Sequence, residues 1–167
     1  MVDNGSFIEV AIDIKIPVHA QLNTQTPSEL SAQLIGKRVL VLDDNMTACN
    51  VVVAYLERMN IVASYRTNCI DATAKLHHQL NIGEPIDLVI VDYIMPDMNG
   101  VDFIKQTLSD TKLLTPPEFI IMSSTGRLAY NQDIQSLGVD FVLEKPVMPD
   151  TLKLALINEL ALRSQLS

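Results

Sequence analysis

The sequence predicts an α/β fold with a doubly wound parallel sheet, and two observations carry this prediction. Short apolar runs rich in Val and Ile recur without the alternation of a half-exposed strand, as expected for strands buried on both faces. They occupy residues 39–42, 88–91, 119–122 and 141–143. Between these runs, apolar residues recur at helical spacing from about residue 37 onward. Strands that alternate with helices in this way are typical of an open parallel sheet with helices on both faces.

Each predicted strand is followed by a predicted helix. A short second strand at Ile61–Ala63 completes five strand–helix pairs. The spacing of apolar residues and the Gly and Pro residues at segment ends predict these helices: Met46–Met59, Asp71–Leu80, Val101–Leu108, Leu128–Leu137 and a last helix from about Pro149 to Leu162. Gly138 suits a left-handed stop to the fourth helix.

Composition limits the classes of protein to be considered. The 167 residues are 48% hydrophobic, enough for one substantial core. A net charge of −8 and a pI near 4.7 argue against a nucleic-acid partner, which needs clustered Lys and Arg. No apolar stretch approaches the roughly 18 residues of a membrane span, and no signal-peptide pattern opens the chain. We therefore expect a cytoplasmic protein without membrane contact, with Cys49 and Cys69 as reduced thiols.

Polar residues stand where the buried runs end. Each of the four runs ends at or next to such a residue. Together they supply three carboxylates, one hydroxyl and one ammonium, from Asp43, Asp44, Asp92, Ser123 and Lys145. Ligands collect at the carboxyl ends of strands in open parallel sheets, so we expect these groups to converge on one edge. Carboxylates suit Mg²⁺, and a hydroxyl with an ammonium suits phosphoryl oxygens. The set predicts a magnesium-dependent phosphoryl-accepting site.

Residues 37–163 resemble the receiver domain of two-component signalling proteins, which has a flavodoxin-like (βα)5 fold. The motifs that carry the resemblance are Val41-Leu42-Asp43-Asp44-Asn45, the stretch from Val91 to Gly100, Ser123 and Lys145-Pro146. The resemblance implies a phosphoacceptor at Asp92 and a cis peptide bond before Pro146. It also implies a Mg²⁺ site formed by Asp43, Asp44, Asp92 and the backbone carbonyl of Ile94. Ser123 and Lys145 would contact phosphoryl oxygens.

The same resemblance implies a place in a phosphorelay. The domain would take a phosphoryl group from the phosphohistidine of a histidine kinase onto Asp92. It would then switch conformation or pass the group to a histidine phosphotransfer domain. Its own chemistry would be limited to self-phosphorylation and dephosphorylation, so an assignment as an enzyme stays open.

Two positions depart from the family pattern. An aromatic residue often stands in the fifth strand at the position of Val142, whereas this chain has Phe141 one residue earlier. A shift of one residue in a strand turns the side chain to the other face, so the resemblance does not extend to an aromatic switch. Ile94 stands where polar residues are common, which leaves a backbone carbonyl ligand intact.

Several alternatives remain open. The chain would be a haloacid-dehalogenase-like aspartyl-phosphate phosphatase if a second acid followed the nucleophile by two residues, but Ile94 stands there. A phosphate-independent receiver-like interaction domain is a further alternative. Asp43 and Asp44 are also suited to be simple helix N-caps, and Ser124 competes with Ser123 as the phosphate donor.

Residues 1–36 lie outside the receiver pattern. Phe7–Ile16 alternates apolar and polar residues, which predicts a half-buried strand. With Gly5-Ser6 before it, residues 1–20 resemble the end of a histidine-kinase ATP-binding domain, and residues 21–36 are expected to be a linker. This order is that of a hybrid sensor kinase. Because a lone strand with unpaired edges invites pairing, we also expect a homodimer through residues 7–16.

Overall fold

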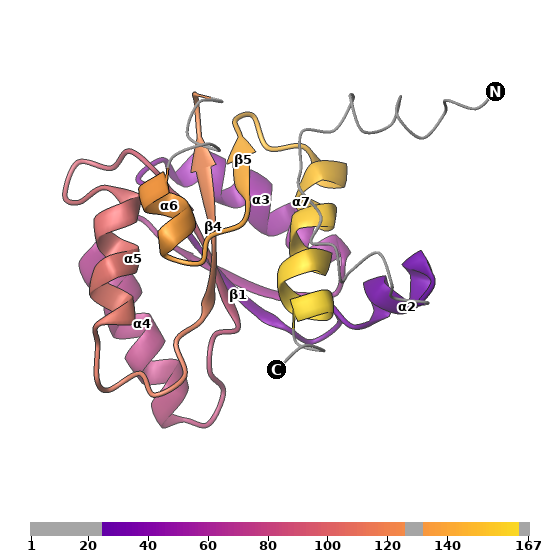
Figure 1. Cartoon of the computed structure of the whole chain (residues 1–167), viewed down its shortest axis with the longest axis horizontal. Coiled ribbons are helices and arrows are strands. Elements are labelled where there is room, and N and C mark those ends of the chain that lie inside the picture. Colours follow the sequence, from indigo (N-terminus) through magenta and orange to yellow (C-terminus); the bar gives the residue numbers. More distant parts are fainter. Residues whose placement is uncertain (1–24, 126–131, 164–167) are drawn as a thin grey trace.

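A five-stranded parallel sheet organises the protein. The computed structural model describes residues 25–125 and 132–163. Its strands are β1 (Arg38–Leu42), β2 (Val62–Arg66), β3 (Leu88–Asp92), β4 (Glu118–Ser123) and β5 (Val142–Glu144). They are arranged in the order β2-β1-β3-β4-β5 and every neighbouring pair is parallel (Figure 1). The predicted doubly wound parallel sheet is confirmed.

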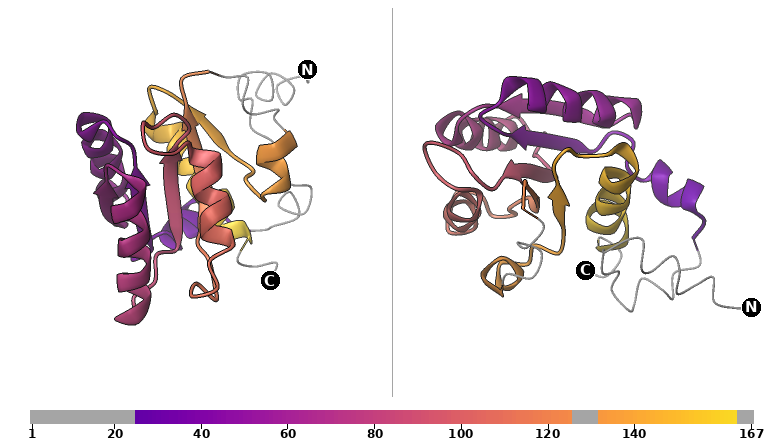
Figure 2. Two further views of the ribbon diagram at one scale, coloured as in Figure 1. Left: turned by 90° about the vertical axis from the view of Figure 1, so that its left-hand side faces the viewer. Right: turned by 90° about the horizontal axis from the view of Figure 1, so that it is seen from above.

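Helices cover both faces of this sheet (Figure 2). The described helices are α2 (Pro27–Ala32), α3 (Met46–Arg58), α4 (Cys69–Asn81), α5 (Gly100–Leu108), α6 (Gln132–Ser136) and α7 (Pro149–Leu156), which continues as a π-helical segment over Ile157–Leu162. The apolar faces of α3 and α7 share one buried cluster, and those of α4, α5 and α6 share another. No described helix has the length and apolarity needed to cross a membrane.

Alternate residues of the central strands enter opposite cores. In β1, Val39 and Val41 pack with α3 and α7, whereas Leu40 and Leu42 pack with α4 and α5. This alternation is the period of a β-strand, and burial on both faces explains why the sequence shows a continuous apolar run. All five side chains of β3 are buried.

The elements differ from the sequence predictions mainly at their ends. β2 runs over Val62–Arg66, further along the chain than the predicted Ile61–Ala63. α4 begins at Cys69, before the predicted Asp71, because Asn68 is its N-cap and accepts a hydrogen bond from the Asp71 amide at 2.8 Å. Gly138 has φ of 82°, in agreement with its predicted role after the fourth helix.

The segment 21–36, expected to be a linker, contains a short helix. Thr26 and Glu29 form a capping box at the start of α2. Leu34 is 1% exposed and belongs to the core cluster of α3 and α7. The end of this segment is therefore packed against the sheet domain. The predicted strand at residues 7–16, and the homodimer inferred from it, lie outside the described residues.

A buried acid anchors the end of the last helix. Oε2 of Glu159 accepts a hydrogen bond from Arg163 Nη1 at 2.8 Å, and Arg163 also pairs with Glu118 at 3.2 Å and Asp140 at 3.4 Å. Within the described chain, Glu159 Oε1 has no hydrogen-bond partner. Burial raises the pKa of Glu159 to about 7, and Arg163 opposes this only partly.

This raised pKa predicts a loss of stability with rising pH. The folded state holds a proton on Glu159 between its ordinary pKa of 4.5 and its folded pKa of about 7. The stabilisation is complete below the lower value and is lost as pH rises through the upper one. Glu159→Gln should therefore remove a pH dependence on the order of 3 kcal/mol. Urea unfolding at pH 5 and pH 8 measures it.

The exposed acid Glu144 provides the control. Glu144→Gln should keep the pH dependence of the wild type. If Glu159→Gln and the wild type lose the same stability between pH 5 and pH 8, Glu159 is not the titrating group.

Candidate functional site

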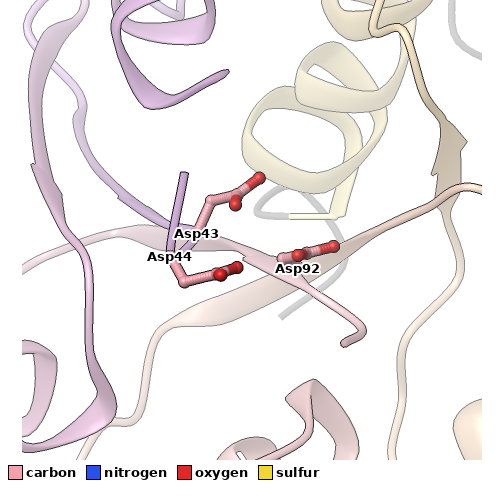
Figure 3. A group of neighbouring side chains, drawn as sticks. All are labelled: Asp43, Asp44 and Asp92. Atoms are coloured by element: carbon pink, nitrogen blue, oxygen red, sulfur yellow. The ribbon is translucent and has the colours of Figure 1, made fainter. Parts of the chain in front are cut away.

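Three carboxylates meet at the carboxyl edge of the sheet. Asp43 follows β1 and Asp92 ends β3, and the register pairs Leu42 with Val91, so that the two strands end side by side. Asp43, Asp44 and Asp92 each place a carboxylate oxygen within 4.8 Å of the others (Figure 3). Asp43 and Asp92 are buried, whereas Asp44 is exposed. The convergence expected from the strand ends is present.

The acids after β1 are not the cap of the following helix. Asn45 is the N-cap of α3, and its side chain accepts a hydrogen bond from the Ala48 amide at 3.1 Å. Asp43 instead accepts a hydrogen bond from the Asn45 amide at 2.9 Å through Oδ1. The capping function belongs to a neighbour, which leaves Oδ2 of Asp43 for the acid site.

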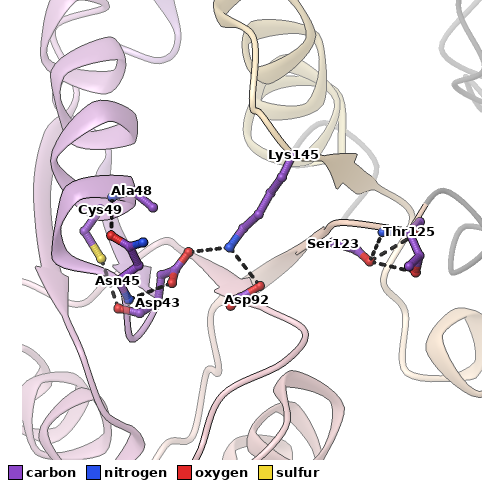
Figure 4. Close-up of polar contacts among 8 residues, drawn as sticks. All are labelled: Asp43, Asn45, Ala48, Cys49, Asp92, Ser123, Thr125 and Lys145. Carbon is purple, nitrogen blue, oxygen red and sulfur yellow. Dashed lines mark hydrogen bonds and ion pairs between the residues drawn. The ribbon is translucent and has the colours of Figure 1, made fainter.

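Lys145 joins two of the carboxylates. Its Nζ lies 2.7 Å from Asp43 Oδ2 and 3.1 Å from Asp92 Oδ1 (Figure 4). The backbone amide of Lys145 donates to the Ser123 carbonyl at 2.9 Å, which fixes the start of the side chain at the end of β4. The peptide bond between Lys145 and Pro146 is cis, as the family resemblance implied. Lys145 is thus a member of the site rather than a solvated surface lysine.

The site holds more acidic groups than basic groups, and burial shifts the pKa values of both kinds. Burial raises the pKa of Asp92, the Lys145 hydrogen bond opposes this, and the negative charges of Asp43 and Asp44 add to it. Burial alone would lower the pKa of Lys145, but its hydrogen bonds to Asp43 and Asp92 raise it. Desolvation is therefore a larger cause of the raised pKa of Asp92 than repulsion between the acids. One ammonium faces three carboxylates, so the ionised site attracts a further cation.

The hydroxyl of Ser123 is held away from the acids. Ser123 is 3% exposed, and its Oγ accepts a hydrogen bond from the Thr125 amide at 3.0 Å. The same Oγ lies 3.1 Å from the Thr125 carbonyl oxygen, to which it donates, and Figure 4 shows this group directed toward Thr125. Ser124 is exposed. Ser123 stands beside the site on β4, but its hydroxyl does not contact Asp92.

The aromatic residue directly before the last strand, Phe141, faces the core. Phe141 is 3% exposed and packs in the α3–α7 cluster with Leu143, whereas Val142 packs against the opposite cluster. Phe141 and Val142 therefore face opposite sides of the sheet, as expected from their one-residue separation. The Ile94 side chain is 69% exposed in the loop after β3.

Two residues that shape the site were not among the predicted site residues. Gly100 begins α5, and a Cβ atom at this position would lie 2.5 Å from the Asp92 carbonyl oxygen. Cys49 donates its thiol to the Asp43 carbonyl at 3.2 Å, and burial raises its pKa to about 11, so the thiol stays protonated. Gly has poor helix propensity, so the Gly within the predicted loop-to-helix segment is the sequence signal for the close approach of Gly100 to Asp92.

Comparison with known families gives a match over most of the chain. The model of the response regulator receiver domain matches residues 39–157. The two-component response regulator ORR3 of rice (Oryza sativa subsp. indica) is 25% identical over 111 residues, which are 66% of this chain and 81% of that protein. Hybrid signal transduction histidine kinase L of Dictyostelium discoideum is 26% identical over 130 residues, 77% of this chain but 7% of that protein.

Several solved structures have the same fold as this chain. One is the receiver domain of the response regulator Ssk1 of Saccharomyces cerevisiae, crystallised with the histidine phosphotransfer signalling protein Ypd1. It is similar to this chain with a TM-score of 0.64 and 16% identity, over 78% of this chain and 92% of that one. At this identity the similarity shows the shared fold.

The close approach at Gly100 predicts a sensitive position. Gly100→Ala places a methyl group against the backbone of Asp92, so the start of α5 or the end of β3 has to move. We expect a loss of about 1–3 kcal/mol in unfolding free energy, as for other overpacked positions. Urea unfolding measures the loss, and the backbone amide shift of Asp92 reports the displacement.

Met46→Ala is a suitable control, because Met46 is the first residue of α3 and is 56% exposed. This control should be close to neutral. A Gly100→Ala variant as stable as the wild type, with unchanged shifts around Asp92, would contradict the steric argument.

Proposed function

The chain belongs to the response regulator receiver domain family of two-component signalling, and we propose that it accepts a phosphoryl group on the Asp92 carboxylate. The observation that supports this most is the pairing of one ammonium, Lys145, with both Asp43 and Asp92 at a buried strand end. A buried carboxylate that lies next to one cation, in a site that can take up a second cation, is suited to a nucleophilic role.

The reaction is a transfer between nitrogen and oxygen. An oxygen of Asp92 attacks the phosphorus of a phosphohistidine and forms a P–O bond. The P–N bond breaks, and its electron pair returns to the imidazole nitrogen, which takes up a proton. The product on this chain is an acyl phosphate at Asp92. The chemistry of the domain itself would be limited to this self-phosphorylation and to hydrolysis of the acyl phosphate.

The acid cluster fits a Mg²⁺ ion. Asp43, Asp44 and Asp92 supply the hard oxygen ligands that Mg²⁺ prefers, and their carboxylates are already within 4.8 Å of one another. We include the backbone carbonyl of Ile94 in the ligand set. When bound, Mg²⁺ would neutralise charge on the phosphoryl oxygens.

Lys145 and Ser123 complete the contacts to the phosphoryl group. The Lys145 ammonium moves its pairing from Asp92 to a phosphoryl oxygen as the carboxylate becomes an acyl phosphate. Ser123 releases Thr125 and donates its hydroxyl to another phosphoryl oxygen. The conformational response then centres on the end of β4, because Phe141 packs in the α3–α7 core and Val142 has no ring.

Exposed apolar side chains around the acids suit a protein partner. Met46 at the start of α3, Ile94 after β3 and Met148 before α7 are 56%, 69% and 57% exposed. We propose that this rim docks the helices that carry the reactive histidine, in a histidine kinase or a histidine phosphotransfer domain. The Ssk1 receiver domain binds a protein of the second kind.

For the whole chain we propose the organisation of a hybrid kinase segment. Residues 1–20 would be the end of a kinase ATP-binding domain, 21–36 a connector that includes α2, and 37–163 the receiver domain. The similarity to a small part of hybrid kinase L supports this organisation. A cytoplasmic location agrees with Cys49 and Cys69, which are unpaired thiols.

The phosphatase alternative is not favoured. An acid two residues after the nucleophile would be needed for proton transfer, and Ile94 occupies this place with an exposed aliphatic side chain. A phosphate-independent interaction domain would leave the ion pairs of Lys145 without a chemical role.

Phosphoryl acceptance is tested with acetyl phosphate and Mg²⁺. The intact mass should rise by one phosphoryl group, and the Asp92→Asn variant should gain none, because an amide is a poor nucleophile. Asp71→Asn, which changes an exposed acid of α4, is the control and should behave as the wild type. No mass gain in the wild type, or an equal gain in Asp92→Asn, would contradict the proposal.

The proposed role of Ser123 as the phosphate-side hydroxyl distinguishes it from the neighbouring Ser124. Ser123→Ala should still be phosphorylated but should show smaller amide shifts at the end of β4 on addition of beryllofluoride, a phosphoryl mimic. Ser124→Ala should respond as the wild type, because its side chain is exposed. A full response in Ser123→Ala together with a lost response in Ser124→Ala would reverse the assignment.

A further inference from the structure

The loop after Asp92 is fastened to a neighbouring helix by a single carboxylate. Asp97 lies in this loop, and its Oδ2 accepts a hydrogen bond from the backbone amide of Cys69 at 2.8 Å. Cys69 is the first residue of α4, so its N–H is one of the donors that no carbonyl within the helix satisfies. The contact joins two segments that are 28 residues apart in the chain.

This contact is more than a cap for the helix. α4 has its own N-cap, Asn68, which accepts a hydrogen bond from the Asp71 amide at 2.8 Å. Capping side chains come from the residue next to the helix, whereas Asp97 comes from a different loop. The arrangement therefore constrains the loop as well as the helix.

The charge of Asp97 suits this position. The hydrogen bond from the Cys69 amide holds the pKa of Asp97 below its ordinary value, so the carboxylate is ionised at neutral pH. An anion at the first turn of a helix is favoured by the helix dipole. Burial, with the charge of Asp97 beside it, raises the pKa of the Cys69 thiol to about 12, so this thiol stays neutral.

Backbone hydrogen bonds hold the two ends of the same loop. The Tyr93 amide donates to the Met122 carbonyl at 2.9 Å, and the Gly100 amide donates to the Tyr93 carbonyl at 2.9 Å. Met95 is 7% exposed and packs in the same cluster as Cys69. Ile94 lies between these anchors. The hydrogen bond that Asp97 accepts from the Cys69 amide of α4 fixes the loop at its middle and restricts the backbone on both sides.

We propose that Asp97 is a positioning residue for the acid site: by tying the loop to α4 it holds the Ile94 carbonyl where Asp43, Asp44 and Asp92 converge. This inference rests on the proposed function for the role of the Ile94 carbonyl. Asp97 is not among the residues that would hold the metal or the phosphoryl group. Its loss therefore weakens Mg²⁺ binding through the loop.

A double-mutant cycle tests the contact from both sides. Asp97→Ala removes the acceptor, and Cys69→Pro removes the donor at a first helical position, where Pro is accepted. Asp102→Ala removes an equal charge from the exposed face of α5, and Cys69→Ser keeps the amide. Calorimetric Mg²⁺ titration gives the affinity of each variant, and thermal melts show that each is folded.

We expect Asp97→Ala and Cys69→Pro each to bind Mg²⁺ about ten-fold more weakly, as for other groups that orient metal ligands. The double variant should be no weaker than either single variant, because both remove one interaction. The two controls should bind as the wild type. If one single variant fails to fold, the other decides.

Three results would overturn the inference: wild-type affinity in a folded Asp97→Ala or Cys69→Pro variant, additive losses in the double variant, or a wild type that binds no Mg²⁺. Failure of phosphoryl acceptance is a separate outcome. A wild type that binds Mg²⁺ but gains no phosphoryl mass contradicts the proposed function, while the cycle still decides the role of Asp97.

Discussion

The ion pairs of Lys145 hold the functional edge of this protein together. Its ammonium reaches carboxylates from two strands, Asp43 after β1 and Asp92 in β3, at 2.7 Å and 3.1 Å. Both carboxylates are buried, and a buried charge without a partner is strongly unfavourable. A single cation does not balance three acids, however. The site is therefore stable enough to persist and is still attractive to a second cation, which is the condition for metal-assisted phosphoryl transfer.

The sheet supplies the geometry that this balance requires. Parallel strands with matched register end side by side, so residues far apart in the chain meet without a long loop. Close contacts then restrict each segment: Gly100 lets α5 approach the Asp92 backbone, the Lys145 amide binds the Ser123 carbonyl, and Asp97 binds the start of α4. The acid site thus depends on tertiary contacts beyond the residues that would touch a phosphoryl group.

The sequence predicted the parts of this arrangement that depend on local pattern. Continuous apolar runs indicated doubly buried strands, and the acids that follow them indicated the edge at which Asp43, Asp44 and Asp92 converge. The remaining features depend on contacts between distant segments. Helix α2 lies in polar sequence, but Leu34, two residues after the end of the helix, packs in the core. The Asp97 carboxylate pairs with the Cys69 amide, 28 residues away, and no spacing rule predicts this pairing.

Calorimetric titration with Mg²⁺ is the most direct test of the charge balance at the sheet edge. The wild type should bind one ion, and Asp44→Asn should bind it more than about ten-fold more weakly, since groups that merely orient metal ligands already cost about that much. Glu57→Gln, which neutralises an exposed acid of α3, should bind as the wild type. Equal affinities in the wild type and Asp44→Asn would show that the three carboxylates do not form the metal site.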